Sequence, residues 1–134
     1  MKTISNSKVL LDTHALLWWL SGDSALSQKA KKIIATDEIE ILINAASAWD
    51  ISTKNRIGKL TIPIVSIRDL TQMIIDQNFV FLSISFEHAL LAGGFEQLHK
   101  DPVDRMLAAQ AISESIPIVS NDINLEKFGA TRIW

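Results

Sequence analysis

The stretch Val9-Leu10-Leu11-Asp12 indicates how this chain folds. Its three apolar residues do not alternate with polar ones, which is typical of a strand that is buried on both faces. An acid ends the strand, and a helical segment follows at Ala15 to Leu20 before Ser21-Gly22-Asp23 interrupts it. This order of strand, acid and helix is typical of a parallel sheet covered by helices.

The alternation of strands and helices continues to the end of the chain. Further strands are expected at Ile39 to Ile43, Phe79 to Ile84, Ile116 to Ser120 and Thr131 to Ile133. Helices are expected from Ser27 as N-cap to about Ala35, and from Ala45 to about Ile57 with Gly58 as C-cap. Another helix is expected from a capping box at Ser66 and Asp69 to about Asn78, and one more from Ser85 as N-cap to Gly93-Gly94. The last long helix is expected to begin at Asp101-Pro102-Val103-Asp104. The pattern predicts an α/β fold, a three-layer α/β/α sandwich with a central parallel β-sheet, formed by residues 1–134 as a single domain.

Composition limits the class of protein. A chain of 134 residues, 48% of them hydrophobic, can bury one core without disulfide or zinc staples. It has no cysteine, which excludes thiolate metal sites and fits a reducing compartment. We find neither a signal peptide nor an apolar run of the roughly 18 residues that span a bilayer, and so expect a cytoplasmic protein with no membrane contact. The net charge of −2 is unfavourable for nucleic-acid binding unless cations offset the carboxylates.

Four aspartates fall near the carboxyl ends of the expected strands, where parallel sheets bind ligands. Asp12 directly follows the first strand, Asp122 follows Ile116 to Ser120 with one residue between, Asp104 lies in the first turn of the helix before that strand, and Asp50 lies in the helix after Ile39 to Ile43. Carboxylates that converge raise one another's pKa values unless cations intervene. Hard oxygen ligands suit Mg²⁺ or Mn²⁺, which can activate water and orient a phosphate. We therefore predict a metal site for phosphodiester hydrolysis.

Each of these acids also has a purely structural explanation. Asp12 and Asp104 stand where an N-cap and a capping-box acid belong, and Asp101 is the natural N-cap of the last long helix. Asp122 can form an Asx-turn with Asn121. Capping alone does not require the acids to converge, so the hypothesis of a site depends on their conjunction.

Six stretches follow one another as they do in a known family: LLDTHALLWWL (10–20), AASAWDI (45–51), RIGKL (56–60), EHAL (87–90), DPVDRMLAAQA (101–111) and VSND (119–122). In this order they resemble a PIN domain, specifically the VapC ribonuclease toxins of type II toxin–antitoxin pairs. The resemblance implies a PIN-like fold, RNA cleavage that depends on Mg²⁺ or Mn²⁺, a VapB-like antitoxin that binds over the acidic groove, and a homodimer. It also implies that Asp12, Asp104 and Asp122 bind the metal and act in catalysis.

Asp50, the fourth expected catalytic and metal-site residue, departs from the family pattern. The family usually has glutamate after this tryptophan, and aspartate is shorter by one methylene. Its carboxylate is therefore expected to reach the metal through water or from a closer backbone. Aspartate also has a poor helix propensity, although Lys54 four residues later can pair with it. A catalytically weakened interaction module is the alternative that this departure keeps open.

Basic and aromatic neighbours are candidates for binding RNA. Lys54, Arg56, Lys59 and Arg105 are suited to phosphates, and a solvated helix face is the alternative for the first three. Trp49 either stacks on a base or packs against the protein.

Hydroxyl and imidazole groups near the acids are weaker candidates. Thr13 and Ser120 match small residues that line such sites, and both can equally serve as cap or turn residues. His14 and His99 are not expected to bind the metal, because hard divalent ions prefer oxygen.

Two other functions remain open. One is a solitary RNA-processing nuclease without an antitoxin, which the chain alone does not separate from a toxin. The other is phosphoryl transfer with Asp12 as the nucleophile. That chemistry usually needs a lysine after the late strand, where Ser120-Asn121-Asp122 stands instead.

Overall fold

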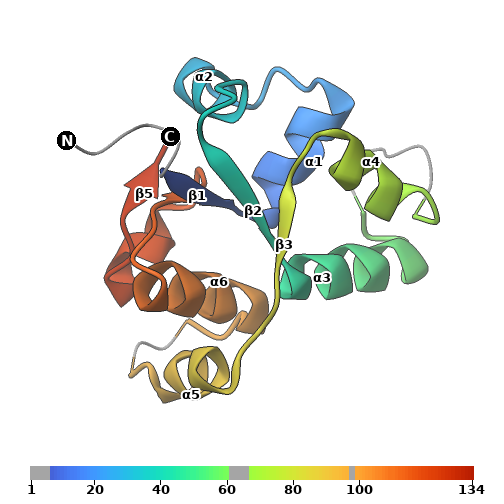
Figure 1. Ribbon diagram of the computed structural model, residues 1–134. Helices are drawn as coiled ribbons and strands as arrows, with labels where there is room; N and C mark the ends of the chain where they lie inside the picture. The colour runs from blue at the N-terminus through green and yellow to red at the C-terminus, as the bar shows by residue number, and fades with distance from the viewer. Residues whose placement is uncertain (1–6, 61–66, 97–98) are drawn as a thin grey trace.

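A five-stranded sheet lies at the centre of the protein in the computed structural model, which describes residues 7–60, 67–96 and 99–134 (Figure 1). In chain order the strands are β1 Lys8–Leu11, β2 Glu40–Asn44, β3 Val80–Leu82, β4 Ile118–Val119 and β5 Arg132–Ile133. They lie side by side in the order β3-β2-β1-β4-β5, and every neighbouring pair is parallel. The predicted α/β fold with a central parallel sheet is confirmed.

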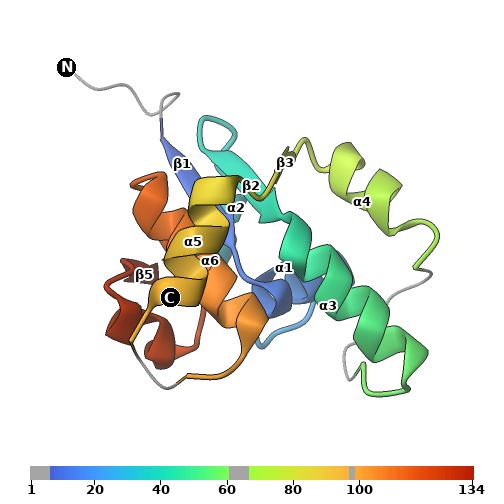
Figure 2. The same cartoon turned by 90° about the horizontal axis from the view of Figure 1, so that it is seen from below.

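Helices cover both faces of this sheet. In chain order they are α1 Thr13–Ser21, α2 Gln28–Ile34, α3 Ala45–Arg56, α4 Leu70–Asp76, α5 Phe86–Gly94 and α6 Pro102–Ser113, followed by the 3-10 helix η2 Ile123–Phe128. Figures 1 and 2 show α1, α2 and α4 on one side of the sheet and α6 on the other, with α5 packed along α6. Within the described ranges, no helix is long and apolar enough to cross a membrane.

The two faces of β1 enter two separate cores. Val9 and Leu11 pack with residues of α1, α2 and α4, whereas Leu10 packs with residues of α6 and η2. All three side chains are at most 4% exposed. Because both faces are buried, consecutive apolar residues are required, which is the physical basis of the non-alternating strand pattern.

Side-chain caps fix most of the predicted helix starts. Ser27 caps α2 and Asp101 caps α6 through side-chain oxygens that accept backbone N–H groups. Ser85 caps α5 in a reciprocal pair, since its hydroxyl accepts from the N–H of His88 at 3.0 Å and the His88 ring accepts from the N–H of Ser85 at 3.0 Å. These starts are set locally, which is why the sequence predicted them correctly.

Several boundaries differ from the prediction. Asp69 precedes α4 but makes no side-chain capping hydrogen bond, and Ser66 of the predicted capping box lies outside the described residues. Helix α3 has Ile57 as its C-cap, and Gly58 follows with a φ of 74°, which glycine adopts without steric cost. The last two strands are only two residues long, and η2 was not predicted. Short strands and 3-10 turns depend on neighbouring elements more than on local pattern.

The two-sided core makes a matched pair of substitutions informative. Ile118 in β4 is fully buried, whereas Ile75 on α4 is 47% exposed. We expect Ile118→Ala to lower the free energy of unfolding by about 2–5 kcal/mol, because it removes buried methyl groups and leaves a cavity. Ile75→Ala should change it by less than about 0.5 kcal/mol. Chemical denaturation measures both, and equal losses would contradict this description of the core.

Candidate functional site

The four predicted aspartates line one small pocket, of about 80 Å³. Its lining residues are Asp12, Thr13, His14, Asp50, Lys54, Asp101, Asp104 and Asp122. Two of the acids stand just beyond the ends of β1 and β4, and the others come from α3 and from the start of α6. The structure thus brings together residues that lie far apart in the sequence, and it adds Asp101, for which only a capping role was predicted.

Asp12 is the most buried acid of the pocket. Its backbone N–H donates to the carbonyl of Val119 at 3.1 Å, and its carboxylate accepts from the N–H of Ala15 at 2.7 Å, which caps α1. Asp12 as a whole residue is only 6% exposed. Burial raises the pKa of the Asp12 carboxyl, and the negative charge of Asp104 adds to this, while hydrogen bonds from Ser120 and Ala15 act in the opposite direction.

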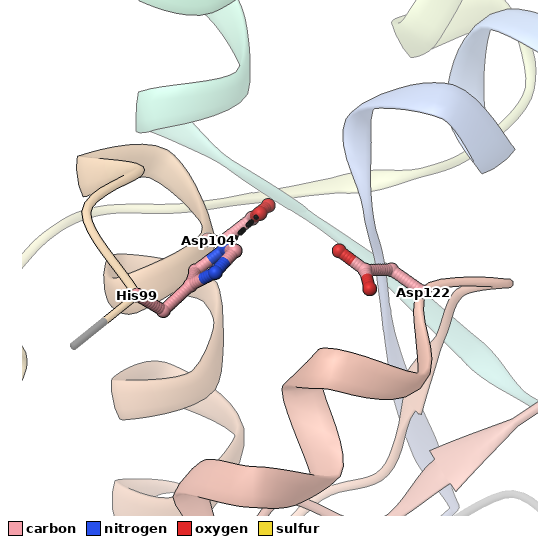
Figure 3. Close-up of side chains that lie close together, drawn as sticks. All are labelled: His99, Asp104 and Asp122. Carbon is pink, nitrogen blue, oxygen red and sulfur yellow. Dashed lines mark hydrogen bonds and ion pairs between the residues drawn. The ribbon is translucent and has the colours of Figure 1, made fainter. Parts of the chain in front are cut away.

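Asp104 faces Asp122 across the pocket, as Figure 3 shows. The Nε2 atom of His99 lies 2.8 Å from Oδ2 of Asp104. Burial raises the pKa of the Asp104 carboxyl, the hydrogen bond to His99 lowers it, and the charges of Asp101 and Asp122 raise it further. Ligand atoms of His99, Asp104 and Asp122 all lie within 4.8 Å of one another, which is close enough for one ion to contact all three.

Asp122 combines a structural role with its position in the pocket. Its Oδ1 accepts from the N–H of Asn124 at 2.9 Å and begins η2, so the predicted Asx-turn runs forward to Asn124 and does not involve Asn121. Its own N–H donates to the hydroxyl of Ser120 at 3.0 Å. Ser120, which is fully buried, therefore contacts both Asp122 and Asp12.

Asp50 reaches the pocket from α3 although it is shorter than glutamate. Its Oδ2 lies 3.2 Å from Nζ of Lys54, which confirms the predicted pair between positions four apart. The Asp50 side chain is 18% exposed and that of Lys54 is 39% exposed. Lys54 thus brings one positive charge to a pocket lined by five carboxylates.

A polar network that the sequence analysis missed holds α3 in place. The Thr13 hydroxyl donates to the Ser47 hydroxyl at 3.0 Å, which ties the starts of α1 and α3 together. Asn44 caps α3 and donates to the side chain of Gln110 on α6, whose amide in turn lies 3.3 Å from the His88 ring. These groups are almost fully buried and satisfy one another. No local pattern marks such a network, because its hydrogen-bonded pairs are up to 66 positions apart.

Arg105 does not bind the pocket. Its guanidinium donates to the carbonyls of Ala92 at 2.9 Å, His99 at 3.0 Å and Phe95 at 2.6 Å. It also lies 5.8 Å from the ring centroids of Phe95 and Phe128. The prediction that Arg105 grips RNA phosphates is wrong, because its donors fasten the segment between α5 and α6. The same contacts position His99 beside Asp104.

The donor set fits a hard divalent cation. Carboxylate oxygens dominate the pocket, as Mg²⁺ and Mn²⁺ prefer. The raised pKa values of Asp12 and Asp104 show that their charged forms are disfavoured, and a cation would offset that cost. His99 was not expected to be a ligand, and its hydrogen bond to Asp104 suits it to orienting that carboxylate.

Comparisons with known proteins identify the family of folds. The family model described as PIN domain matches residues 9–130. No curated protein matches the chain. Solved structures are similar as well. VapBC2 from Rickettsia felis bound to a promoter DNA fragment has a TM-score of 0.65, 13% identity and coverage of 94% of this chain and 97% of that chain. A toxin–antitoxin complex from Klebsiella pneumoniae has a TM-score of 0.64, 15% identity and coverage of 94% of this chain and 96% of that chain. VapC20 from Mycobacterium tuberculosis, a sarcin–ricin loop cleaving toxin, has a TM-score of 0.64, 12% identity and coverage of 93% of this chain and 98% of that chain. At these identities the likeness is one of fold.

Replacing Asp12, the most buried acid of the pocket, tests whether its buried charge destabilises the folded protein. Asp12→Asn is expected to raise the melting temperature of the metal-free protein at pH 7.5 by a few degrees. Asparagine also caps helices, and it carries no charge to bury. The folded pKa of Asp12 is raised, so the stability that this group contributes is present at low pH and is lost as pH rises through that pKa. The difference should therefore vanish below about pH 4.

Scanning calorimetry in chelator measures this difference. Asp69→Asn is the matched control, because Asp69 is exposed and makes no side-chain capping bond. Added Mg²⁺ should then stabilise the wild type more than Asp12→Asn, since an ion that binds only the folded state raises the melting temperature. If Asp12→Asn is no more stable than the wild type in chelator, the buried charge of Asp12 does not destabilise the metal-free protein.

The revised role of Arg105 makes a separate prediction. Arg105→Ala should lower the free energy of unfolding by about 1.5–3 kcal/mol, because carbonyls of the α5–α6 connection lose a charged donor. Arg56→Ala removes an exposed arginine and should change stability by less than about 0.5 kcal/mol. Urea denaturation measures the free energy of unfolding of both variants. If Arg105→Ala lowers it as little as Arg56→Ala, Arg105 does not stabilise the α5–α6 connection.

Proposed function

Because this chain belongs to the PIN-domain family, we propose that it is a metal-dependent endoribonuclease, which hydrolyses RNA phosphodiester bonds. The observation that carries the proposal is the pocket into which Asp12, Asp50, Asp104 and Asp122 converge. These four residues would hold Mg²⁺ or Mn²⁺, which would supply Lewis-acid chemistry at a phosphodiester. In a protein with a net charge of −2, such a cation together with a local basic patch would offset the carboxylates that repel a polyanion.

The acids have distinct parts in this proposal. Asp104 and Asp122, whose carboxylates face each other, would hold the ion, and Asp12 would add a buried carboxylate at the end of β1. Asp50 positions the ion or a water, and its pairing with Lys54 limits how far it can reach. His99 keeps the Asp104 carboxylate in one orientation through their 2.8 Å hydrogen bond.

Basic residues of α3 and of the segment after it are proposed to contact RNA phosphates. Lys54 lines the pocket, and Arg56 and Lys59 are exposed nearby in the sequence. Neither Arg56 nor Lys59 takes part in an ion pair with another described residue. Exposed cations without partners can release counterions on binding a nucleic acid, which makes the affinity depend on salt.

A toxin of a VapBC-type pair is the form of this function that we propose. Similar folds occur in complexes described as VapBC2 and as a toxin–antitoxin complex. The expected partners are a VapB-like antitoxin, which covers the acidic groove, and a second copy of the chain. Phe86 and Leu90 on α5 are 80% and 63% exposed, and they leave apolar surface for a protein partner. Purification together with the product of a neighbouring gene tests the antitoxin, and light scattering tests the dimer.

A catalytically weakened interaction module is the second candidate. It is favoured by Asp50, which stands where the family usually has glutamate and is bound to Lys54. Such a protein would keep the fold and the metal affinity of the pocket without turnover.

Cleavage of total cellular RNA distinguishes the two candidates. The purified, antitoxin-free protein should produce discrete fragments with Mg²⁺ or Mn²⁺ and none with chelator. Asp104→Asn should lower the cleavage rate by at least about 100-fold, because loss of an ion ligand costs more than loss of a residue that merely orients one. Gel electrophoresis of the fragments over time measures the rate.

Asp69→Asn is the control for this experiment, since it makes the same chemical change on an exposed residue that does not line the pocket. Its rate should equal that of the wild type. A folded protein that binds Mg²⁺ but cuts no RNA in any condition would support the interaction module and count against the nuclease.

A further inference from the structure

A second hollow opens beside the acidic pocket. Its volume is about 140 Å³, and it lies between α3 and the start of α6. Its lining residues are Trp49, Asp50, Thr53, Asp101, Pro102 and Val103. Asp50 and Asp101 line the acidic pocket as well, so the two spaces adjoin. A molecule that occupies one of them can extend into the other.

Trp49 is the largest side chain of this hollow and is left in solvent. It is 62% exposed, so packing against the protein, the alternative to stacking, covers less than half of its surface. Its indole makes no ring contact with another aromatic residue in the described part of the chain. An indole that is mostly exposed can offer a surface on which a planar ring stacks.

We propose that this hollow, the Trp49 subsite, binds one unpaired nucleobase of the RNA whose phosphate occupies the acidic pocket. The proposal rests on the proposed nuclease function and deepens it, since it assigns to Trp49 the binding of a base next to the cleaved phosphate. A cavity of about 150 Å³ holds one benzene ring, so the hollow of about 140 Å³ has room for the six-membered ring of one base. Stacking on an aromatic side chain is the usual way in which proteins hold splayed bases.

The polar lining favours a base over the other possible occupants. Two carboxylates, Asp50 and Asp101, repel a phosphate from this space. Both hydrogen bonds that Asp101 accepts from described residues end on its Oδ1, so Oδ2 is available to an amino group. Amino groups on base edges are suitable donors to carboxylates. An apolar side chain of a protein partner would instead bury these carboxylates without donors, which is costly.

Binding of labelled RNA decamers tests the subsite without cleavage. Every protein carries Asp122→Asn, so that the RNA stays intact, and Mg²⁺ is present throughout. One probe is a decamer of adenosine nucleotides, and the other is a decamer of abasic ribose phosphates with the same charge. Fluorescence anisotropy gives the dissociation constant for each, with the further substitutions Trp49→Ala, Trp49→Phe and Phe81→Ala.

Trp49→Ala should raise the dissociation constant of the adenosine decamer about tenfold and leave that of the abasic decamer within twofold, because only the first probe has bases to stack. Trp49→Phe should retain most of the affinity. Phe81→Ala removes a half-exposed aromatic residue of β3, outside both pockets, and should change neither constant. Unfolding curves check that each variant is folded.

Other outcomes overturn either the Trp49 subsite or the nuclease function on which it rests, and the two can be distinguished. Equal losses for both probes would mean that Trp49 only supports the structure. Unchanged RNA affinity together with a smaller dimer fraction in light scattering would assign Trp49 to a protein interface. Base-dependent binding by a chain whose wild type cuts no RNA would retain the subsite and reject the nuclease. Metal-dependent cleavage by the wild type, with no effect of Trp49→Ala on the binding of either probe, would retain the nuclease and reject the subsite.

Discussion

Parallel pairing of β1 with both β2 and β4 is the constraint on which the rest of the structure depends. Leu11 lies in register with Ile43 on one side and with Val119 on the other. The ladder continues one step beyond β1, where the N–H of Asp12 donates to the Val119 carbonyl. Because neighbouring parallel strands end at the same edge, the residues that follow β1 and β4 meet there. Asp12 and Asp122 are thereby brought together from positions 110 residues apart.

The aspartates of the pocket serve two purposes at once. Asp12, Asp101 and Asp122 each cap a helix, and the same residues line the acidic pocket. Capping and a functional site looked like competing explanations along the sequence, but both hold. A helix start presents unpaired N–H groups and the positive end of its dipole, which stabilises a nearby carboxylate. The caps therefore offset part of the cost of carrying charge in the pocket. The pKa values of Asp12 and Asp104 are still raised, mainly by burial and in addition by neighbouring carboxylates, so the offset is incomplete.

Two sets of internal hydrogen bonds hold the walls of the pocket. Arg105 fastens the segment that carries His99, and His99 in turn bonds Asp104. Asn44 and Gln110 link the start of α3 to α6, so that Asp50 and Trp49 face the start of α6 across a fixed gap. A buried amide must find a partner, which gives these contacts a defined geometry. The acidic pocket and the Trp49 subsite thus share one scaffold.

The sequence by itself determined the class of fold, most helix starts and the candidate acids. Those features depend on local physics: buried strands such as β1 need consecutive apolar residues, Ser27 and Ser85 cap the helices that follow them, and an acid after a strand marks the ligand edge of a sheet. Only the tertiary structure decided the inward turn of Arg105, the contact of His99 with Asp104 and the exposure of Trp49. These outcomes depend on which distant groups become neighbours when the two layers of helices close on the sheet. Periodicity along the chain carries no record of such contacts, because a charged or aromatic side chain at a given position can point equally well to solvent or to a carbonyl that another element supplies.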